Sequence, residues 1–187
     1  MIFKLLRRPA SRSGLIAALL LASAPARAYV ITTPEALLEQ FFPGVPVATV
    51  VYTPDPAGGV ALGTSLGYPL PKPTYEILVG GEAAHPVGYA IFDQQIGLHA
   101  PIDFAVLVGP DVRVQRVEIL VYREAYGDGV RAPAFLRQFV GLGPSAAMRP
   151  GRDIQIVSGA TVSTRSLSIG VRRACALVSA WLNTEGS

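Results

Sequence analysis

Alternating apolar and polar residues divide much of the chain into predicted strands. Apolar or alternating runs occupy residues 47–52, 75–79, 87–92, 102–108 and 112–122. Gly109-Pro110-Asp111 separates the last two runs, which is the signal of a β-hairpin. In the last run the apolar face changes between Val114 and Val117, so we expect a β-bulge there. Strands this close in the sequence favour antiparallel pairing.

Three stretches have helical patterns instead. Thr33-Pro34-Glu35 supplies an N-cap, a proline and an acid, so we expect a helix that runs through Phe41. Residues 133–140 predict a short helix. Residues 166–182 predict the clearest one, with Arg172 and Arg173 opposite an apolar stripe formed by Leu167, Val171, Ala174, Val178, Trp181 and Leu182.

Residues 53–73 contain five prolines and four glycines. This density predicts a long loop without regular structure. Together the patterns predict an α+β fold, in which an antiparallel sheet carries a few flanking helices. We expect a single domain after a signal peptide, divided into residues 1–28 (signal peptide), 29–79 (N-terminal helix, strand and Pro/Gly-rich loop) and 80–182 (the functional domain).

The first 28 residues have the three parts of a secretory signal. Lys4, Arg7, Arg8 and Arg12 precede the apolar run 14–23, and Ala26-Arg27-Ala28 is a small-residue cleavage site. The run is shorter than the roughly 20 residues that span a bilayer. We therefore predict a periplasmic protein exported by a cleavable signal peptide. The alternative is an uncleaved leader that anchors the protein to the membrane.

Charge and composition exclude several classes of function. The chain of 187 residues has a net charge of +3, but five of its sixteen basic residues lie in the leader, and the remainder carries a net charge of −2. We therefore expect no nucleic-acid partner. A lone Cys175 excludes an internal disulfide and a zinc site built on cysteine pairs, and with only two histidines we predict no metal site. Residues 113–173 hold ten arginines and four acids, which indicates a bound anionic group.

A small, hydroxyl-rich segment inside this basic region carries the candidate chemistry. Its residues are Ser158, Gly159, Ala160, Thr161, Ser163 and Thr164, just before the clearest predicted helix. Free N–H groups at a helix start bind anions, so the segment could hold one. The alternative is that Ser163, Thr164 or Ser166 only caps the helix. The glycine spacing fits neither a P-loop nor a dinucleotide fingerprint.

The Ser158-Gly159-Ala160-Thr161 motif, followed by Ser163, resembles the flavinylation motif of the bacterial FMN-binding domain family. Further similarities follow in the family's order over roughly 80–181, at residues 88–90, 101–103, 122–124, 135–139 and 153–164. Members include the C subunit of the sodium-pumping NADH:quinone oxidoreductase, the G subunit of the Rnf complex and the periplasmic domain of the nitrous-oxide-reductase regulator.

The resemblance implies that FMN is the cofactor, attached through its phosphate to Thr161 by a phosphoester. It implies that Ser158, Gly159, Ala160, Ser163 and Thr164 shape the phosphate pocket. Arg137 could approach the phosphate or the flavin, and the alternative is an exposed helix arginine without a role in binding. The implied partners are a flavin transferase, which uses Mg²⁺ and FAD, and a membrane electron-transfer complex acting as donor or acceptor. We expect an electron carrier with no catalytic residue of its own, because the chain offers little room for a substrate domain.

One position departs from the family pattern. Members usually carry an acid six residues before the modified threonine, whereas this chain has Gln155 there and Asp153 two residues earlier. The rival hypothesis is therefore a binding or regulatory module of a membrane redox complex that works without covalent flavin. Elsewhere we expect Arg123 and Glu124 to pair at the end of the sheet.

Overall fold

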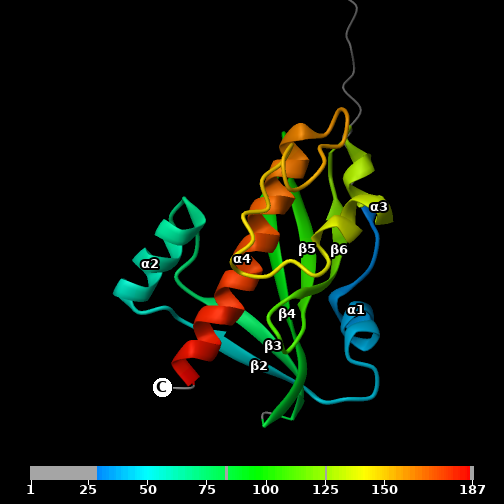
Figure 1. Cartoon of the computed structure of the whole chain (residues 1–187). Helices are drawn as coiled ribbons and strands as arrows, with labels where there is room; N and C mark the ends of the chain where they lie inside the picture. Colours follow the sequence, from blue (N-terminus) through cyan, green and yellow to red (C-terminus); the bar gives the residue numbers. More distant parts are fainter. Residues whose placement is uncertain (1–28, 83, 125, 186–187) are drawn as a thin grey trace, which may run out of the picture.

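The computed structural model describes residues 29–82, 84–124 and 126–185, so the predicted signal peptide lies outside the described residues. Across these residues, six strands form one antiparallel sheet in the order β1-β6-β5-β4-β3-β2 (Figure 1). The strands are β1 (Tyr29–Val30), β2 (Val47–Tyr52), β3 (Tyr75–Glu82), β4 (His85–Ile96), β5 (Pro101–Val108) and β6 (Val114–Tyr122). The predicted α+β class with an antiparallel sheet is confirmed.

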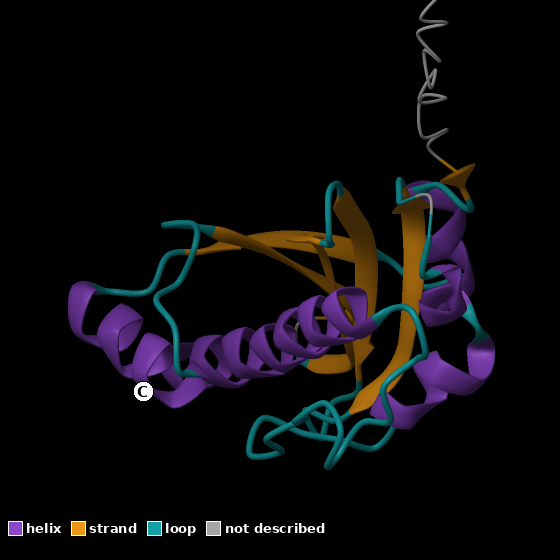
Figure 2. Cartoon of the chain, turned by 90° about the horizontal axis from the view of Figure 1, so that it is seen from above, coloured by secondary structure: helices purple, strands orange, loops and turns teal. Residues whose placement is uncertain are grey.

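Each face of the sheet packs against a hydrophobic core, and successive side chains of β5 point alternately into the two cores. Phe104 and Val106 belong to the main core, whereas Ala105 and Leu107 belong to a smaller core on the other face. Helix α4 (Thr161–Glu185) lies along the face of the main core, and α1 (Pro34–Phe41) covers the smaller one (Figure 2). Successive side chains of a strand point to opposite faces, so one apolar run supplies both cores.

Two local predictions are confirmed. In the β5–β6 pairing, Leu107 lies opposite Arg116 and Val108 opposite Val114, so Gln115 is the extra residue of the expected bulge. Helix α1 begins as predicted, with the Thr33 side chain accepting a hydrogen bond from the N–H of Ala36 at 3.3 Å. Residues 133–140 form α3 (Pro133–Leu136), continued by a 3₁₀ turn over Arg137–Phe139.

The loop prediction for residues 53–73 is wrong, because Pro56–Leu66 form helix α2. The Asp55 side chain caps it by accepting a hydrogen bond from the N–H of Gly58 at 2.6 Å, and Gly67 ends it in the left-handed conformation. The helix packs on α4, where the Arg172 guanidinium donates to the carbonyl of Leu66 at 3.1 Å. Capping and packing thus outweigh the low helix propensity of three internal glycines.

Helix α4 begins at Thr161, five residues before the predicted start, so Ser163, Thr164 and Ser166 lie inside it and the capping alternative is wrong. The prediction that Arg172 and Arg173 lie on a polar face of this helix is also wrong in part. Arg173 is fully buried and forms an ion pair with Asp93 of β4. Among the described helices, none combines the length and hydropathy needed to cross a membrane.

Candidate functional site

The motif segment forms a tight turn that leads directly into α4. The N–H of Ala160 donates to the carbonyl of Val157 at 3.0 Å, which leaves Ser158 and Gly159 as the exposed central residues. Gly159 has φ of +74°, a conformation that favours glycine at the third position of a turn. No atom lies within 4 Å of a β-carbon built there, so open space adjoins the turn.

The residues after this turn divide into an exposed hydroxyl and two buried ones. Thr161 is the first residue of α4 and is exposed, whereas Ser163 and Thr164 are buried. The Thr164 hydroxyl accepts a hydrogen bond from the N–H of Val157 at 3.3 Å and so ties the turn to the helix. Of the predicted hydroxyl residues within α4, Thr161 is therefore the one that a reagent in solution reaches.

The loop after β6 packs against the motif from one side. Ala160 is buried beside Gly127, where a β-carbon would come within 3.0 Å of the Ala160 side chain. The Tyr122 hydroxyl donates to the carbonyl of Tyr126 at 2.8 Å and lies 3.5 Å from the Ser163 hydroxyl. Burial raises the pKa of Tyr122, although the Ser163 hydrogen bond opposes that shift. The phenol therefore stays protonated as a donor.

The turn between β4 and β5 lies beside the first turns of α4. Ser166 donates a hydrogen bond to the carbonyl of Ile96 at 2.5 Å. Glu124 accepts hydrogen bonds from the N–H groups of His99 at 2.7 Å and Ala100 at 3.0 Å. Partial burial favours the neutral carboxyl, but these N–H donors outweigh it and hold the pKa of Glu124 below its usual range.

The expected ion pair between Arg123 and Glu124 is not among the contacts of the described residues. Arg123 binds Asp103 instead, at 2.6 Å, and donates to the carbonyl of Pro101 at 3.0 Å. Both residues follow the end of β6, but Arg123 contacts the start of β5, whereas Glu124 contacts the turn between β4 and β5. The result is that Arg123 and Glu124 both fasten the β4–β5 turn.

The two segments that adjoin the start of α4 each carry an exposed apolar side chain. Leu98 of the β4–β5 turn is 57% exposed and Tyr126 of the loop after β6 is 82% exposed. At the start of α4, no hydrogen bond within the described residues uses the N–H groups of Thr161, Val162 or Ser163. The end of the molecule that carries Thr161 therefore offers both free donors and apolar surface.

The predicted Arg137 lines a hollow that no motif residue lines, whereas another arginine lies on α4 itself. Arg137 is exposed and lines a hollow with Arg116 and Glu118 of β6, whereas its neighbour Gln138 accepts a hydrogen bond from the N–H of Gln155 at 2.7 Å. Arg165 lies four residues after Thr161 on α4 and is exposed. The i,i+4 spacing was the signal in the sequence that could have identified it.

Asp153, the acid nearest to the departure at Gln155, closes its own loop. Its carboxylate accepts a hydrogen bond from the N–H of Arg149 at 2.9 Å and lies 3.7 Å from the Arg149 guanidinium and 3.8 Å from that of Arg152. Gln155 is exposed. Asp153 therefore has a structural role in this loop, and an exposed amide stands at the position where the resemblance predicts an acid.

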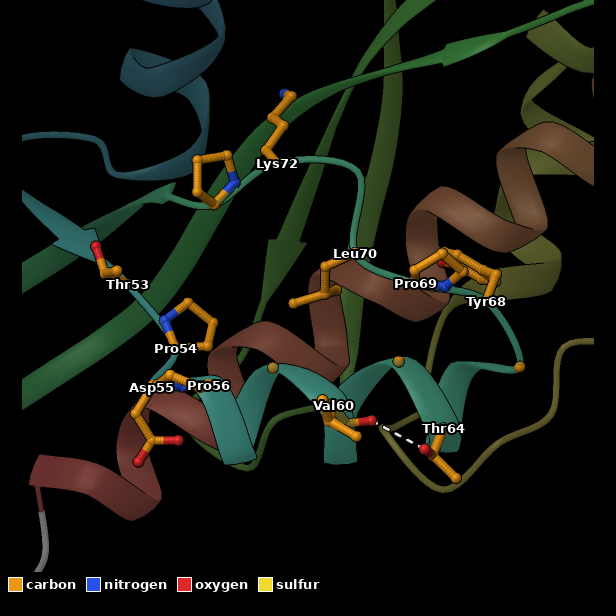
Figure 3. Close-up of a pocket in the computed structure, with 14 residues that line it drawn as sticks. Thr53, Pro54, Asp55, Pro56, Val60, Thr64, Tyr68, Pro69, Leu70 and Lys72 are labelled. Atoms are coloured by element: carbon orange, nitrogen blue, oxygen red, sulfur yellow. Dashed lines mark hydrogen bonds between the residues drawn. The ribbon is translucent and has the colours of Figure 1, made fainter.

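A separate hollow of about 640 Å³ lies between α2 and the segment that follows it (Figure 3). Its walls include Val60, Tyr68, Leu70 and Lys72, with several prolines at the rim. None of the motif residues lines it. The hollow is therefore a different feature from the site at the start of α4.

Comparison with known proteins bears on the site at the start of α4. Residues 97–176 match the family model described as the FMN-binding domain. The fold is similar to the crystal structure of Shewanella oneidensis NqrC, with a TM-score of 0.54 and 16% identity over 75% of this chain and 85% of that one. A second crystal structure is that of the C subunit of the Na(+)-translocating NADH-quinone reductase from Parabacteroides distasonis. It gives a TM-score of 0.45 and 14% identity over 76% of this chain and 85% of that one. No curated protein matches the chain.

Proposed function

We propose that this chain, which carries an FMN-binding domain over residues 97–176, is an extracytoplasmic electron-transfer protein whose FMN is attached to Thr161. The domain indicates FMN as the cofactor. The observation that carries the proposal is the exposed Thr161 hydroxyl, which begins α4 inside the matched residues. The signal-like leader supports export, and the resemblance of the motif to the FMN-binding domain family supports a role beside a membrane redox complex.

The residues present at the site fit a flavin nucleotide. The open space at Gly159 and the free N–H groups of the first turn of α4 suit the phosphate, because a helix N-terminus favours negative charge. Leu98 and Tyr126 offer apolar surface to the flat ring system. When bound, FMN supplies the uptake and release of electrons, while the protein fixes its position and surroundings.

The chemistry of attachment follows from what surrounds Thr161. Its hydroxyl has no hydrogen-bond partner within the described residues, so no local base activates it, and a threonine hydroxyl is a weak nucleophile unaided. A flavin transferase would supply the base and the metal ion. The Thr161 oxygen would form a bond to the FMN phosphorus of FAD, the bond to AMP would break, and the hydroxyl proton would pass to the transferase.

Gln155 favours a second candidate function. If the transferase requires an acid six residues before the threonine, the chain would work as a binding or regulatory module without covalent flavin. Co-expression with a flavin transferase separates the two candidates through the intact mass and the visible spectrum. We expect a yellow protein that gains one FMN, and a colourless Thr161→Ala variant. A colourless wild type beside a flavinylated reference acceptor would support the module instead.

A further inference from the structure

Arg165 stands one helical turn after the proposed attachment site. Thr161 and Arg165 are four residues apart on α4, and both side chains are exposed. Residues at this spacing are neighbours on one face of a helix. Helical side chains also lean toward the N-terminus, so the Arg165 side chain extends toward the turn that begins with Thr161.

Arg165 also differs in its contacts from the arginines of the nearby loops. Arg149 and Arg152 share the carboxylate of Asp153, and Arg131 lies 3.6 Å from Asp128. Arg165 makes no ion pair or hydrogen bond within the described residues. Its guanidinium is therefore free to bind an added anion.

We propose that Arg165 is a positioning residue for the phosphate of the flavin nucleotide, an inference that rests on the proposed function. A guanidinium binds phosphate oxygens through two parallel hydrogen bonds. Arg165 would hold the FMN phosphate of FAD in line with the Thr161 oxygen and would offset the negative charge that the finished phosphoester keeps. The Arg165 guanidinium stays protonated throughout, because the proton of the Thr161 hydroxyl passes to the transferase.

The test is the rate at which purified chain, made without flavin, accepts FMN from FAD with a purified flavin transferase and Mg²⁺. Intact mass gives the initial rate at several concentrations of the chain. We expect Arg165→Gln to lower kcat/KM by about tenfold or more, because it removes a charge-assisted contact. Arg165→Lys should restore part of the rate. The matched control is Arg113→Gln, at an exposed arginine in the turn between β5 and β6, at the end of these strands opposite the β4–β5 turn, and it should match wild type.

A readout of the finished product separates positioning from folding. The phosphorus NMR signal of the attached phosphoester should shift in Arg165→Gln, while the midpoint of thermal unfolding stays at the wild-type value. Equal rates and an unchanged phosphorus signal in Arg165→Gln would overturn the inference and leave attachment at Thr161 standing. An equal loss in Arg113→Gln would also overturn it, by showing a general effect of surface charge. A wild type that accepts no FMN would instead end the proposed function, and this inference with it.

Discussion

At the scale of single residues, three consecutive residues of the motif have different structural roles. Gly159 makes the turn, Ala160 fills the narrow space beside Gly127, and Thr161 exposes its hydroxyl. The turn needs the positive φ of Gly159, the space beside Gly127 needs the small side chain of Ala160, and the exposed position of Thr161 presents its hydroxyl. Under the proposed function, this short motif would specify the attachment site without an acid, a base or a metal ligand of its own.

Glu124 should make stability depend on acid pH. Its pKa is lower in the folded protein than in the unfolded chain, so its stabilisation is complete above the unfolded value near 4.5 and is lost as pH falls through the folded value. We expect Glu124→Gln to lower the free energy of unfolding at pH 7 by about 1–2 kcal/mol, since its N–H donors lose a charged acceptor. Urea unfolding at pH 7 and below pH 4 measures the free energy of unfolding of the wild type and of the variant.

The difference between the Glu124→Gln variant and the wild type should shrink as pH falls through the lowered pKa of the folded protein, because the wild-type carboxyl then becomes neutral as well. A difference that stays constant over this range would show that Glu124 acts only through packing. The effect on the site should be indirect, through the β4–β5 turn that carries Leu98.

At the scale of elements, a buried ion pair fixes α4 on the sheet. Asp93 of β4 accepts hydrogen bonds from the Arg173 Nε atom at 3.0 Å and from the Lys72 ammonium at 2.9 Å, and both Asp93 and Arg173 are almost fully buried. Removing one partner of such a pair leaves the other charge uncompensated in the interior. This contact therefore holds the helix that begins with Thr161.

Asp93→Asn should lower the free energy of unfolding by about 3 kcal/mol. The control is Asp128→Asn, because Asp128 is 77% exposed in its pair with Arg131 and its loss should cost less than about 1 kcal/mol. Urea unfolding of both variants makes the comparison. Equal losses would mean that the buried pair contributes no more than a surface one.

The strands and bulge were predictable because their signals are local, whereas three features of the elements were not. Helix α2 forms in a Pro/Gly-rich segment because Asp55 caps it and α4 supports it. Arg173 is buried because it pairs with Asp93 of β4. This partner lies 80 residues away in the sequence, so no local pattern indicates the burial. The first turn of α4 is rich in hydroxyl residues that favour caps and turns, so its start is decided by packing of Ala160 and Thr164.

At the scale of the whole molecule, the sheet brings together three segments that are distant in the sequence. The β4–β5 turn, the loop after β6 and the motif all meet at the start of α4. The motif itself was recognisable from the sequence, but Leu98 and Tyr126 were not, because only the fold places them beside it. The site is thus a property of the complete sheet rather than of the motif alone.

Cys175 should report the opening of this whole structure. It is buried in the main core, and burial raises the pKa of its thiol to about 12, so at pH 8 it has almost no reactive thiolate. We expect a thiol reagent to label Cys175 only as fast as the protein unfolds. The control carries Thr161→Cys with Cys175→Ser, and its exposed thiol should be labelled at once. Rapid labelling of Cys175 in the folded wild type would contradict the packing described.

The most direct test of the central claim is peptide mapping after co-expression with a flavin transferase. Trypsin cleaves after Arg152 and Arg165, so the peptide Asp153–Arg165 carries Thr161. Attachment predicts that this peptide gains the mass of one FMN less one water, and that fragmentation places the addition on Thr161. An unmodified peptide, or an addition on Ser158, Ser163 or Thr164, would contradict the account.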